Sequence, residues 1–307
     1  MRWPEGKSFA FTVFEDPDSQ TIKGSQCIYD FLSELGFRTT IGIWPLAADP
    51  SLRSDPGLTC ADREYLSWVL QLQSRGFEIG FHNATSHSST REQTQTALQR
   101  FEDLFGAPPR TMSNHYHSKE ALYWGSDRLS GPNRQIYNFA TKWQNRRSSF
   151  GHTPGHPMFW GDLASNKIKY CRNFVFGDIN TLKQCPMMPY HDPDRGFVNY
   201  WFASSEGANL RSCLNRIGEA DQDRLEEQAG ACILYVHFAH GFQEAGEINS
   251  RFCQLMRRIA RKQGWFVPVG ELLDYLITQN ADRVIKPTQR TSLERRWLLH
   301  KLRHGSE

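Results

Sequence analysis

Residues 76–87 read GFEIGFHNATSH, a short alternation of apolar and polar residues that runs directly into His82 and then, five positions later, His87. Such an alternation is typical of a β-strand. The preceding stretch, 61–76, carries apolar residues at helical spacing and ends at a glycine, a frequent helix terminator. The sequence therefore predicts a helix followed by a strand that places two imidazoles at its carboxyl end.

The same order of elements recurs on both sides of this stretch. Strands alternating with helices of this length indicate βαβ units around a parallel sheet, and (β/α) barrels of about 200–250 residues or more form one unit. A chain of 307 residues is long enough for one. The predicted strands lie in residues 8–16, 37–46, 77–82, 230–242 and 265–269, and the predicted helices in 19–36, 61–76, 89–106, 249–264 and 270–279.

Two regions depart from this order. Residues 123–166 mix a short helical piece with Gly, Pro and His turns, and we interpret them as an irregular insertion on the active face of the barrel. Residues 287–307 form a basic amphipathic segment, which we expect to be a helical tail that packs on the barrel or on a partner chain, a homo-oligomer in the second case. The predicted division is a barrel over 1–286 and a tail over 287–307. One face of the tail would carry Leu293, Trp297, Leu298 and Leu302.

Composition excludes several classes of protein. Charged residues make up 22% and the formal net charge is +3, without a long basic block, so no nucleic-acid partner is expected. No run approaches the roughly 18 apolar residues of a membrane span. Seven scattered cysteines without a C-x-x-C pair predict reduced thiols, and no secretory signal is visible, so a cytoplasmic location is expected.

Unusual polar residues follow three of the predicted strands. The carboxyl ends of parallel strands lie on one face of a barrel, where catalytic groups converge. A carboxylate and two neutral imidazoles suit a divalent metal and leave positions open for water and substrate. The residues in question are Glu15, Asp16 and Asp18 after the first strand, His82 and His87 after the third, and His237 and His240 after the late strand.

Four motifs resemble the polysaccharide deacetylase family: TVFEDPD, GFEIGFHNATSH, ILYVHF and GWFVPVGELLDYL. The resemblance spans residues 8 to about 277. It implies a distorted (β/α)7 barrel whose enzymes remove acetyl groups from N-acetylated sugars with a divalent metal, zinc in the first place, with Co²⁺, Ni²⁺, Mn²⁺ or Fe²⁺ as alternatives. Carried over residue by residue, the resemblance makes Glu15 the general base, Asp16, His82 and His87 the metal ligands, and His237 the general acid.

Three departures from the family pattern affect this assignment. Glu15 stands where the family usually has Asp, and the histidine spacing is one residue longer than H-x-x-x-H, which leaves open whether His87 or His115 completes the metal site. The Arg-Pro-Pro-Tyr motif is missing. We therefore expect a different set of substrate-binding residues, namely Asn114, His115, Tyr116, Trp124, His191 and His240, with His240 also the rival of His237 as general acid.

The function expected from the sequence is metal-dependent removal of an acetyl group from an N-acetylated sugar or a related small-molecule or glycan precursor. Two alternatives remain open. One is hydrolysis of another carbon–nitrogen bond, such as a formamide or a cyclic imide, on the same fold. The other is a barrel that binds carbohydrate without turnover.

Overall fold

A closed barrel of parallel strands forms the centre of the computed structural model, which describes residues 2–52, 54–141, 149–279 and 283–304. Neighbours pair in chain order, and β1 pairs with both β2 and β7, which closes the barrel. The predicted (β/α)7-type fold is confirmed. Its strands are β1 Phe9–Glu15, β2 Thr40–Ile43, β3 Glu78–Phe81, β4 Thr111–Met112, β5 Tyr170–Phe176, β6 Tyr200–Glu206 and β7 Ala231–Val236.

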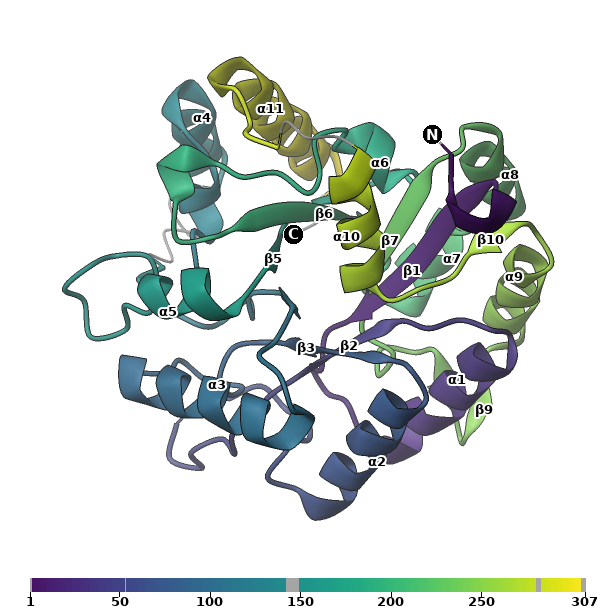
Figure 1. Ribbon diagram of the computed structural model, residues 1–307, viewed down its shortest axis with the longest axis horizontal. Helices are drawn as coiled ribbons and strands as arrows, with labels where there is room; N and C mark the ends of the chain where they lie inside the picture. The colour runs from purple at the N-terminus through teal and green to yellow at the C-terminus, as the bar shows by residue number, and fades with distance from the viewer. Residues whose placement is uncertain (1, 53, 142–148, 280–282, 305–307) are drawn as a thin grey trace.

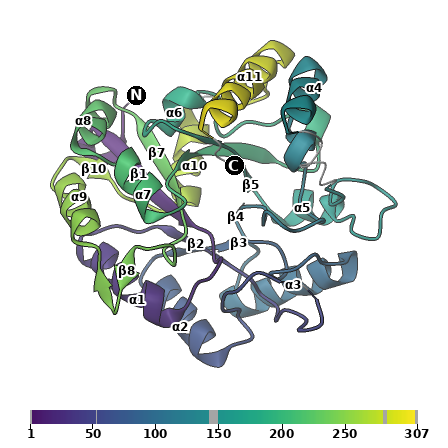
Figure 2. The same ribbon diagram turned by 180° about the vertical axis from the view of Figure 1, so that it is seen from behind.

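Helices surround the barrel on its outer side (Figures 1 and 2). Their ends follow local chemistry: α3 begins with a capping box between Thr90 and Gln93 and ends at Gly106, whose φ of 80° is a conformation that favours glycine. The helices are α1 Ile22–Glu34, α2 Arg63–Ser74, α3 Arg91–Phe105, α4 Gly131–Ala140, α5 Gly161–Lys167, α6 Thr181–Gln184, α7 Leu210–Arg216, α8 Glu219–Glu227, α9 Ser250–Ala260, α10 Val269–Gln279 and α11 Pro287–His304.

The short elements complete the chain. Single 3₁₀ turns lie at Pro4–Gly6, Gly125–Arg128 and Pro193–Arg195, and a small hairpin joins β8 Gln243–Glu244 to β9 Glu247–Ile248.

The predicted strand at 265–269 is largely wrong. Only β10, Gly264–Trp265, pairs with the sheet, and it does so at Phe9 and Ala10 of β1. On that edge of β1, the end of the strand is already paired with β2, at Phe14 and Glu15, so only its beginning is free for β10. Pro268 lacks the N–H that would continue a ladder.

The helix α10 covers the amino end of the barrel, in front of the strands in Figure 1. The amide of Gly270 donates to Glu78 Oε2 at 2.8 Å and that of Val269 to Thr40 Oγ1 at 3.0 Å, both at the beginnings of their strands. One end of the barrel is therefore closed, and the opposite end, seen in Figure 2, carries the loops that follow the strands.

The central region is more regular than predicted. Residues 123–166 contain α4 and α5, and residues 142–148 lie outside the described part of the chain. The helix α4 lies beside α11 in both views (Figures 1 and 2), where the rings of Tyr137 and Trp297 are 5.8 Å apart. The strands β5 and β6, which the sequence did not reveal, follow this region.

The C-terminal helix α11 packs on the barrel. Leu293, Trp297 and Leu298 are buried, whereas Leu302 is 51% exposed. Glu294 is fully buried and accepts hydrogen bonds from Ser130 and Arg195. A buried, paired carboxylate is costly to separate from its partners, so α11 is fixed in register against α4.

Replacing Trp297 by Ala is expected to destabilise the protein by about 3–5 kcal/mol, because a fully buried indole leaves a large cavity. Urea unfolding measures this change. Leu302→Ala on the same helix is the control, and its half-exposed side chain should give at most about 0.5 kcal/mol. Equal small effects would mean that α11 contributes little to the fold.

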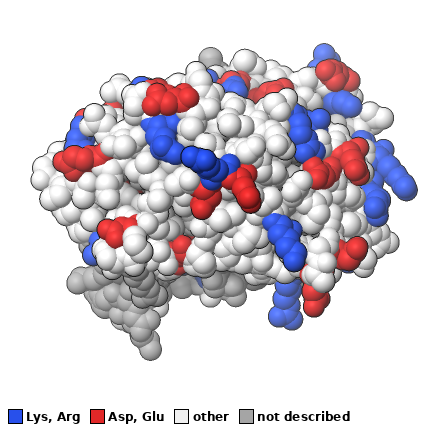
Figure 3. All heavy atoms as spheres, turned by 90° about the horizontal axis from the view of Figure 1, so that it is seen from below, with Lys and Arg blue, Asp and Glu red and all other residues white. Residues whose placement is uncertain are grey.

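The face drawn in Figure 3 carries charges of both signs without one dominant sign. Figure 3 shows Lys and Arg interspersed with Asp and Glu over the face that it presents. Among the described residues, no helix combines the length and the apolar character that a bilayer-spanning segment requires. All seven cysteines are free thiols.

Candidate metal and catalytic site

Glu15 and Asp16, at the end of β1, face opposite sides of the barrel wall, because successive side chains of a strand alternate. Phe14 faces the interior, where its ring lies 6.2 Å from that of Phe202. Asp16 faces the same side. Glu15 faces outward, and its Oε2 accepts a hydrogen bond of 2.6 Å from Tyr29 on α1. Burial raises the pKa of Glu15 to about 7, despite this hydrogen bond.

Asp16 is held by an arginine that the sequence analysis did not identify. Arg172 of β5 donates to both Asp16 oxygens, with 3.0 Å between Nη1 and Oδ1. Its guanidinium also lies over the Tyr235 ring at 4.2 Å. Burial alone would raise the pKa of Asp16, but Arg172 and then His82 lower it below its ordinary value. Asp16 is therefore an ionised carboxylate in fixed orientation.

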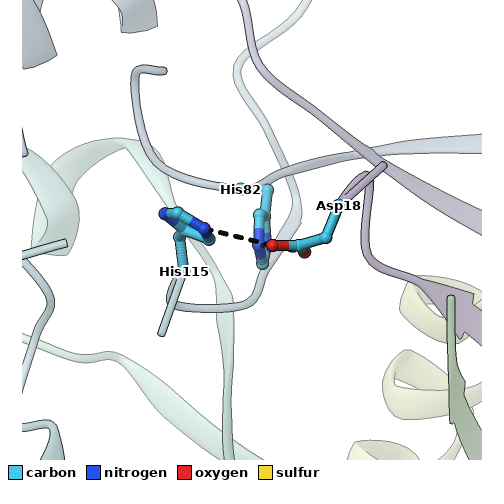
Figure 4. Close-up of side chains that lie close together, drawn as sticks. All are labelled: Asp18, His82 and His115. Carbon is cyan, nitrogen blue, oxygen red and sulfur yellow. Dashed lines mark ion pairs between the residues drawn. The ribbon is translucent and has the colours of Figure 1, made fainter. Parts of the chain in front are cut away.

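Asp18 lies at the centre of three imidazoles. The Nε2 atoms of His82, His115 and His237 lie 3.4, 3.1 and 3.3 Å from its carboxylate oxygens. Figure 4 shows His82 and His115 converging on Asp18. Burial would raise the pKa of Asp18, but the neighbouring imidazoles of His115, His237 and His82 hold it well below its ordinary range.

The tautomer of His82 follows from its neighbours. Ser113 Oγ donates its only hydrogen to Asp16 Oδ1 at 2.8 Å. The 2.7 Å contact between Ser113 Oγ and His82 Nδ1 must then have the imidazole as donor. The other ring nitrogen, His82 Nε2, lies 3.4 Å from Asp18 Oδ2. An imidazole with its other nitrogen hydrogen-bonded is the usual form of a metal-binding histidine.

Two buried nitrogen atoms in this cluster lack hydrogen bonds. His82 is 1% exposed and His115 is fully buried, and among the described residues neither Nε2 atom makes a contact with hydrogen-bond geometry. Buried polar atoms are nearly always satisfied. Ligands about 2.0–2.1 Å from a tetrahedral zinc lie about 3.3 Å apart, close to the separations found here. Asp18, His82 and His115 therefore fit a divalent ion.

His87 is directed away from this cluster. Its Nε2 accepts a hydrogen bond of 2.9 Å from the Asp49 amide, and its Nδ1 donates to the Ser88 carbonyl at 2.9 Å. Both ring nitrogens are used to fix two loops together. We attribute the direction of His87 to the extra residue between His82 and His87. His115, from the loop after β4, occupies the position beside His82.

His237 lies beside the cluster with a defined protonation pattern. Its Nδ1 donates to the Ala208 carbonyl at 3.0 Å, so the proton on Nε2 is the one that titrates. Burial would lower the pKa of His237, but Asp18 and Asp16 raise it to about 9. The ring of His240, which is exposed, lies 4.6 Å away, and burial and His237 lower its pKa.

A cavity of about 830 Å³ opens beside the cluster. Its wall includes the aromatic residues Tyr116, Trp124 and Phe150, and Asp55 and His117 stand where the wall meets His115. Trp124 and Phe150 come from the irregular central region, so part of that region does border the site. The complete lining is Leu52, Ser54, Asp55, His87, Ser88, Tyr116, His117, Ser118, Lys119, Trp124, Ser149, Phe150 and Met158.

Two of the expected substrate-binding residues lie elsewhere. Asn114 is buried, and its amide exchanges two hydrogen bonds with the backbone of Leu122, which fixes the loop after β4. His191 donates from Nδ1 to the carbonyl of Asn199, the residue before β6, so it lies at the amino end of the barrel. That is the end opposite the metal cluster.

Some site residues had a signal in the sequence. Asp18 stands in the same FEDPD run as Asp16. Arg172 is a cation within the apolar stretch YCRNFVF, and a charge inside a buried strand is rare unless it is paired. Asp55 and Ser113 have no such signal, because only the fold brings their loops to this end of the barrel.

Known proteins resemble this chain in fold. No protein-family model and no curated protein gives a significant sequence match. PuuE allantoinase has a TM-score of 0.50 at 11% identity, over 91% of this chain and 93% of that one. The peptidoglycan deacetylase PdaC from Bacillus subtilis has 0.42 at 14%, over 96% and 99%. The chitin deacetylase from the fungal pathogen Colletotrichum lindemuthianum has 0.43 at 13%, over 87% and 88%. At these identities the similarity concerns the fold alone.

Proposed function

We propose that this chain is a metal-dependent hydrolase that removes the acetyl group from an N-acetylated sugar. The observation that carries the proposal is the buried Asp18, His82 and His115 cluster, which has unsatisfied imidazole nitrogens beside an arginine-held carboxylate. A divalent ion bound there would lower the pKa of a bound water and polarise the amide carbonyl. Zinc is the first candidate because two imidazoles and a carboxylate suit it.

Asp16 is the general base in this proposal, in place of Glu15. One of its carboxylate oxygens lies within 4.8 Å of a carboxylate oxygen of Asp18 and of a ring nitrogen of His237, whereas Glu15 faces α1. Hydrogen bonds from Arg172 and Ser113 fix the orientation of the Asp16 carboxylate, so it can accept a proton from the attacking water without reorienting.

His237 supplies the proton to the departing amine. The Ala208 carbonyl fixes the ring through Nδ1, and the carboxylates of Asp18 and Asp16 raise the pKa of His237, which favours a proton on Nε2. An amine is a poor leaving group unless it is protonated, so this transfer is needed for amide cleavage. His240 is exposed and its lowered pKa makes it the weaker candidate for this role.

The cavity provides the place for the sugar. Tyr116, Trp124 and Phe150 offer aromatic planes on which the apolar face of a pyranose can stack, while serine hydroxyls reach its polar edge. The volume of the cavity lies within the about 300–1,000 Å³ of ordinary ligand sites and fits a mono- or disaccharide unit. The substrate is a small-molecule or glycan amide, and the cytoplasmic location and homo-oligomer expected from the sequence stay predictions.

Hydrolysis of another carbon–nitrogen bond remains the second candidate. The Asn114, His115 and Tyr116 segment replaces the Arg-Pro-Pro-Tyr motif, and here His115 belongs to the metal cluster. Incubation with N-acetylglucosamine oligomers, formamides and cyclic imides, followed by quantification of acetate, formate and ring-opened product, distinguishes the two. Release of formate or ring-opened acid without acetate would overturn the acetyl specificity.

The wild-type protein is expected to bind one zinc ion per chain, and His82→Ala and His115→Ala should weaken that binding by at least about 10-fold, because each removes a ligand. Titration calorimetry of the metal-free protein measures both. His87→Ala is the control and should bind zinc as tightly as the wild type, since its ring nitrogens serve Asp49 and Ser88. Loss of zinc in His87→Ala with retention in His115→Ala would instead support the family pattern.

A further inference from the structure

Asn83, the residue after His82, holds the backbone of the other proposed histidine ligand. It is fully buried, and its side-chain Oδ1 accepts a hydrogen bond of 2.8 Å from the main-chain N–H of His115. This bond joins the loop after β3 to the loop after β4, from which the two imidazoles converge on Asp18 in Figure 4. The centroids of the His82 and His115 rings are 5.3 Å apart. A contact that joins the two backbones bears directly on this separation.

The bond continues the hydrogen-bond ladder between β3 and β4 beyond the ends of both strands. Where the strands end, the main-chain N–H of Ser113 donates to the Phe81 carbonyl at 3.1 Å. The bonds of a parallel ladder recur at every second residue of each strand, so the next would run from His115 to the main-chain carbonyl of Asn83. The chain turns out of the strand at Asn83, whose φ of 62° is left-handed. Its side-chain oxygen takes the place of that carbonyl.

Asparagine combines two properties that this position requires. It is one of the few residues other than glycine that adopt a left-handed backbone. Its side chain also offers both an acceptor and a donor, and Nδ2 donates to Oε1 of Glu120 at 3.2 Å while Oδ1 accepts from His115. An aliphatic side chain would provide neither hydrogen bond.

Glu120 connects both ends of the loop after β3. It is fully buried, and besides the bond from Asn83 its carboxylate accepts one of 3.1 Å from the main-chain N–H of Ser89. The carbonyl of Glu120 accepts a further bond of 2.7 Å from the indole of Trp160, which is also fully buried. The amide of Asn83 is therefore oriented by a carboxylate that is itself held in place.

We propose that Asn83 is a positioning residue that sets the relative placement of His82 and His115 around the divalent ion. The inference rests on the proposed function, because it concerns the same ion. Groups that orient metal ligands without touching the metal contribute about 10–100-fold to affinity. Loss of the Asn83 side chain should therefore weaken the site although every proposed ligand remains.

The test removes this side chain with Asn83→Gly, because glycine adopts a left-handed backbone without strain. Zinc affinity is measured by competition with a chromophoric chelator, and the visible absorption at saturating Co²⁺ reports the geometry of the ligands. We expect Asn83→Gly to bind zinc at least about 10-fold more weakly than the wild type and to change the Co²⁺ spectrum.

Asn133→Gly is the matched control. Asn133 is a buried residue of α4, and its Nδ2 also donates to a buried carboxylate at 3.2 Å, that of Glu294. Its replacement should destabilise the protein in urea unfolding, because the same kind of bond is lost. Zinc affinity and the Co²⁺ spectrum should stay as in the wild type, which separates positioning of the ligands from a general loss of stability.

The double variant Asn83→Asp/Glu120→Gln reverses donor and acceptor in the same contact. The introduced carboxylate can still accept from the His115 N–H, and the introduced amide can donate to it while keeping an oxygen for the Ser89 N–H. This variant should have the Co²⁺ spectrum of the wild type, because the bond to the His115 backbone is retained.

The outcomes separate the two proposals. If the wild type binds neither zinc nor Co²⁺, the metal site and the proposed function fail, and the positioning role with them. If the wild type binds one ion and Asn83→Gly matches it in affinity and spectrum, only the positioning role is overturned. Equal changes in Asn133→Gly would also overturn it. If Asn83→Gly does not fold, the double variant keeps the test, since loss of the wild-type spectrum there overturns the positioning role.

Discussion

Asp16→Asn is expected to lower kcat for amide hydrolysis by at least about 100-fold, because the amide side chain cannot accept the proton of the attacking water. Zinc binding should remain close to wild type, since the proposed ligands are Asp18, His82 and His115. Steady-state kinetics on the zinc-loaded protein, together with the bound zinc per chain, measure both effects.

This substitution also removes the carboxylate of the buried Asp16–Arg172 ion pair, at an expected cost of about 3–5 kcal/mol. The double variant Asp16→Asn/Arg172→Met removes that penalty. It should recover stability in urea unfolding without recovering activity, which separates the loss of a base from the loss of folded protein.

Glu15→Gln is the matched control for Asp16→Asn. Glu15 is buried against Tyr29 on the outer side of the strand, so its replacement by the isosteric amide should leave most of the activity intact. If Glu15→Gln lowers kcat by about 100-fold and Asp16→Asn stays active, Glu15 is the base, as the family pattern implies, and our assignment is wrong.

His237→Ala is expected to lower kcat/KM for an N-acetyl amide by about 10²–10⁴-fold and to spare an activated acetyl ester, whose leaving group needs no proton. The wild-type profile should fall as pH rises through the pKa of His237, because only the protonated ring is an acid. That pKa is raised, so the fall should lie above the ordinary value of about 6.5 and toward about 9.

In His237→Ala this alkaline fall should disappear. The control is His240→Ala, which removes the neighbouring exposed imidazole and should keep both the alkaline fall and the preference for good leaving groups near wild type. Dependence on the leaving group in His240→Ala and not in His237→Ala would make His240 the acid.

The alternation of strands and helices could be read from the sequence wherever the pattern is local. The predicted helices at 61–76 and 89–106 correspond to α2 and α3, because their apolar spacing and terminal glycines depend only on near neighbours. The barrel followed from that alternation. The strands β5 and β6 did not, because Arg172 interrupts one apolar stretch and serines the other. The partners of these polar residues are distant in the sequence: Asp16 for Arg172, and Thr181 of α6 for Ser205.

The sequence by itself determined which chemical groups gather at the open end of the barrel, since a parallel sheet brings the residues after every strand to one edge. Asp16, His82 and His237 were predicted there and lie there. Only the tertiary structure decided their pairing. Whether Glu15 or Asp16 faces the interior depends on strand register, and whether His87 or His115 joins His82 depends on loop packing. Strand register and loop packing both depend on contacts between residues far apart in the chain, such as Arg172 with Asp16. A local sequence pattern contains no information about such contacts.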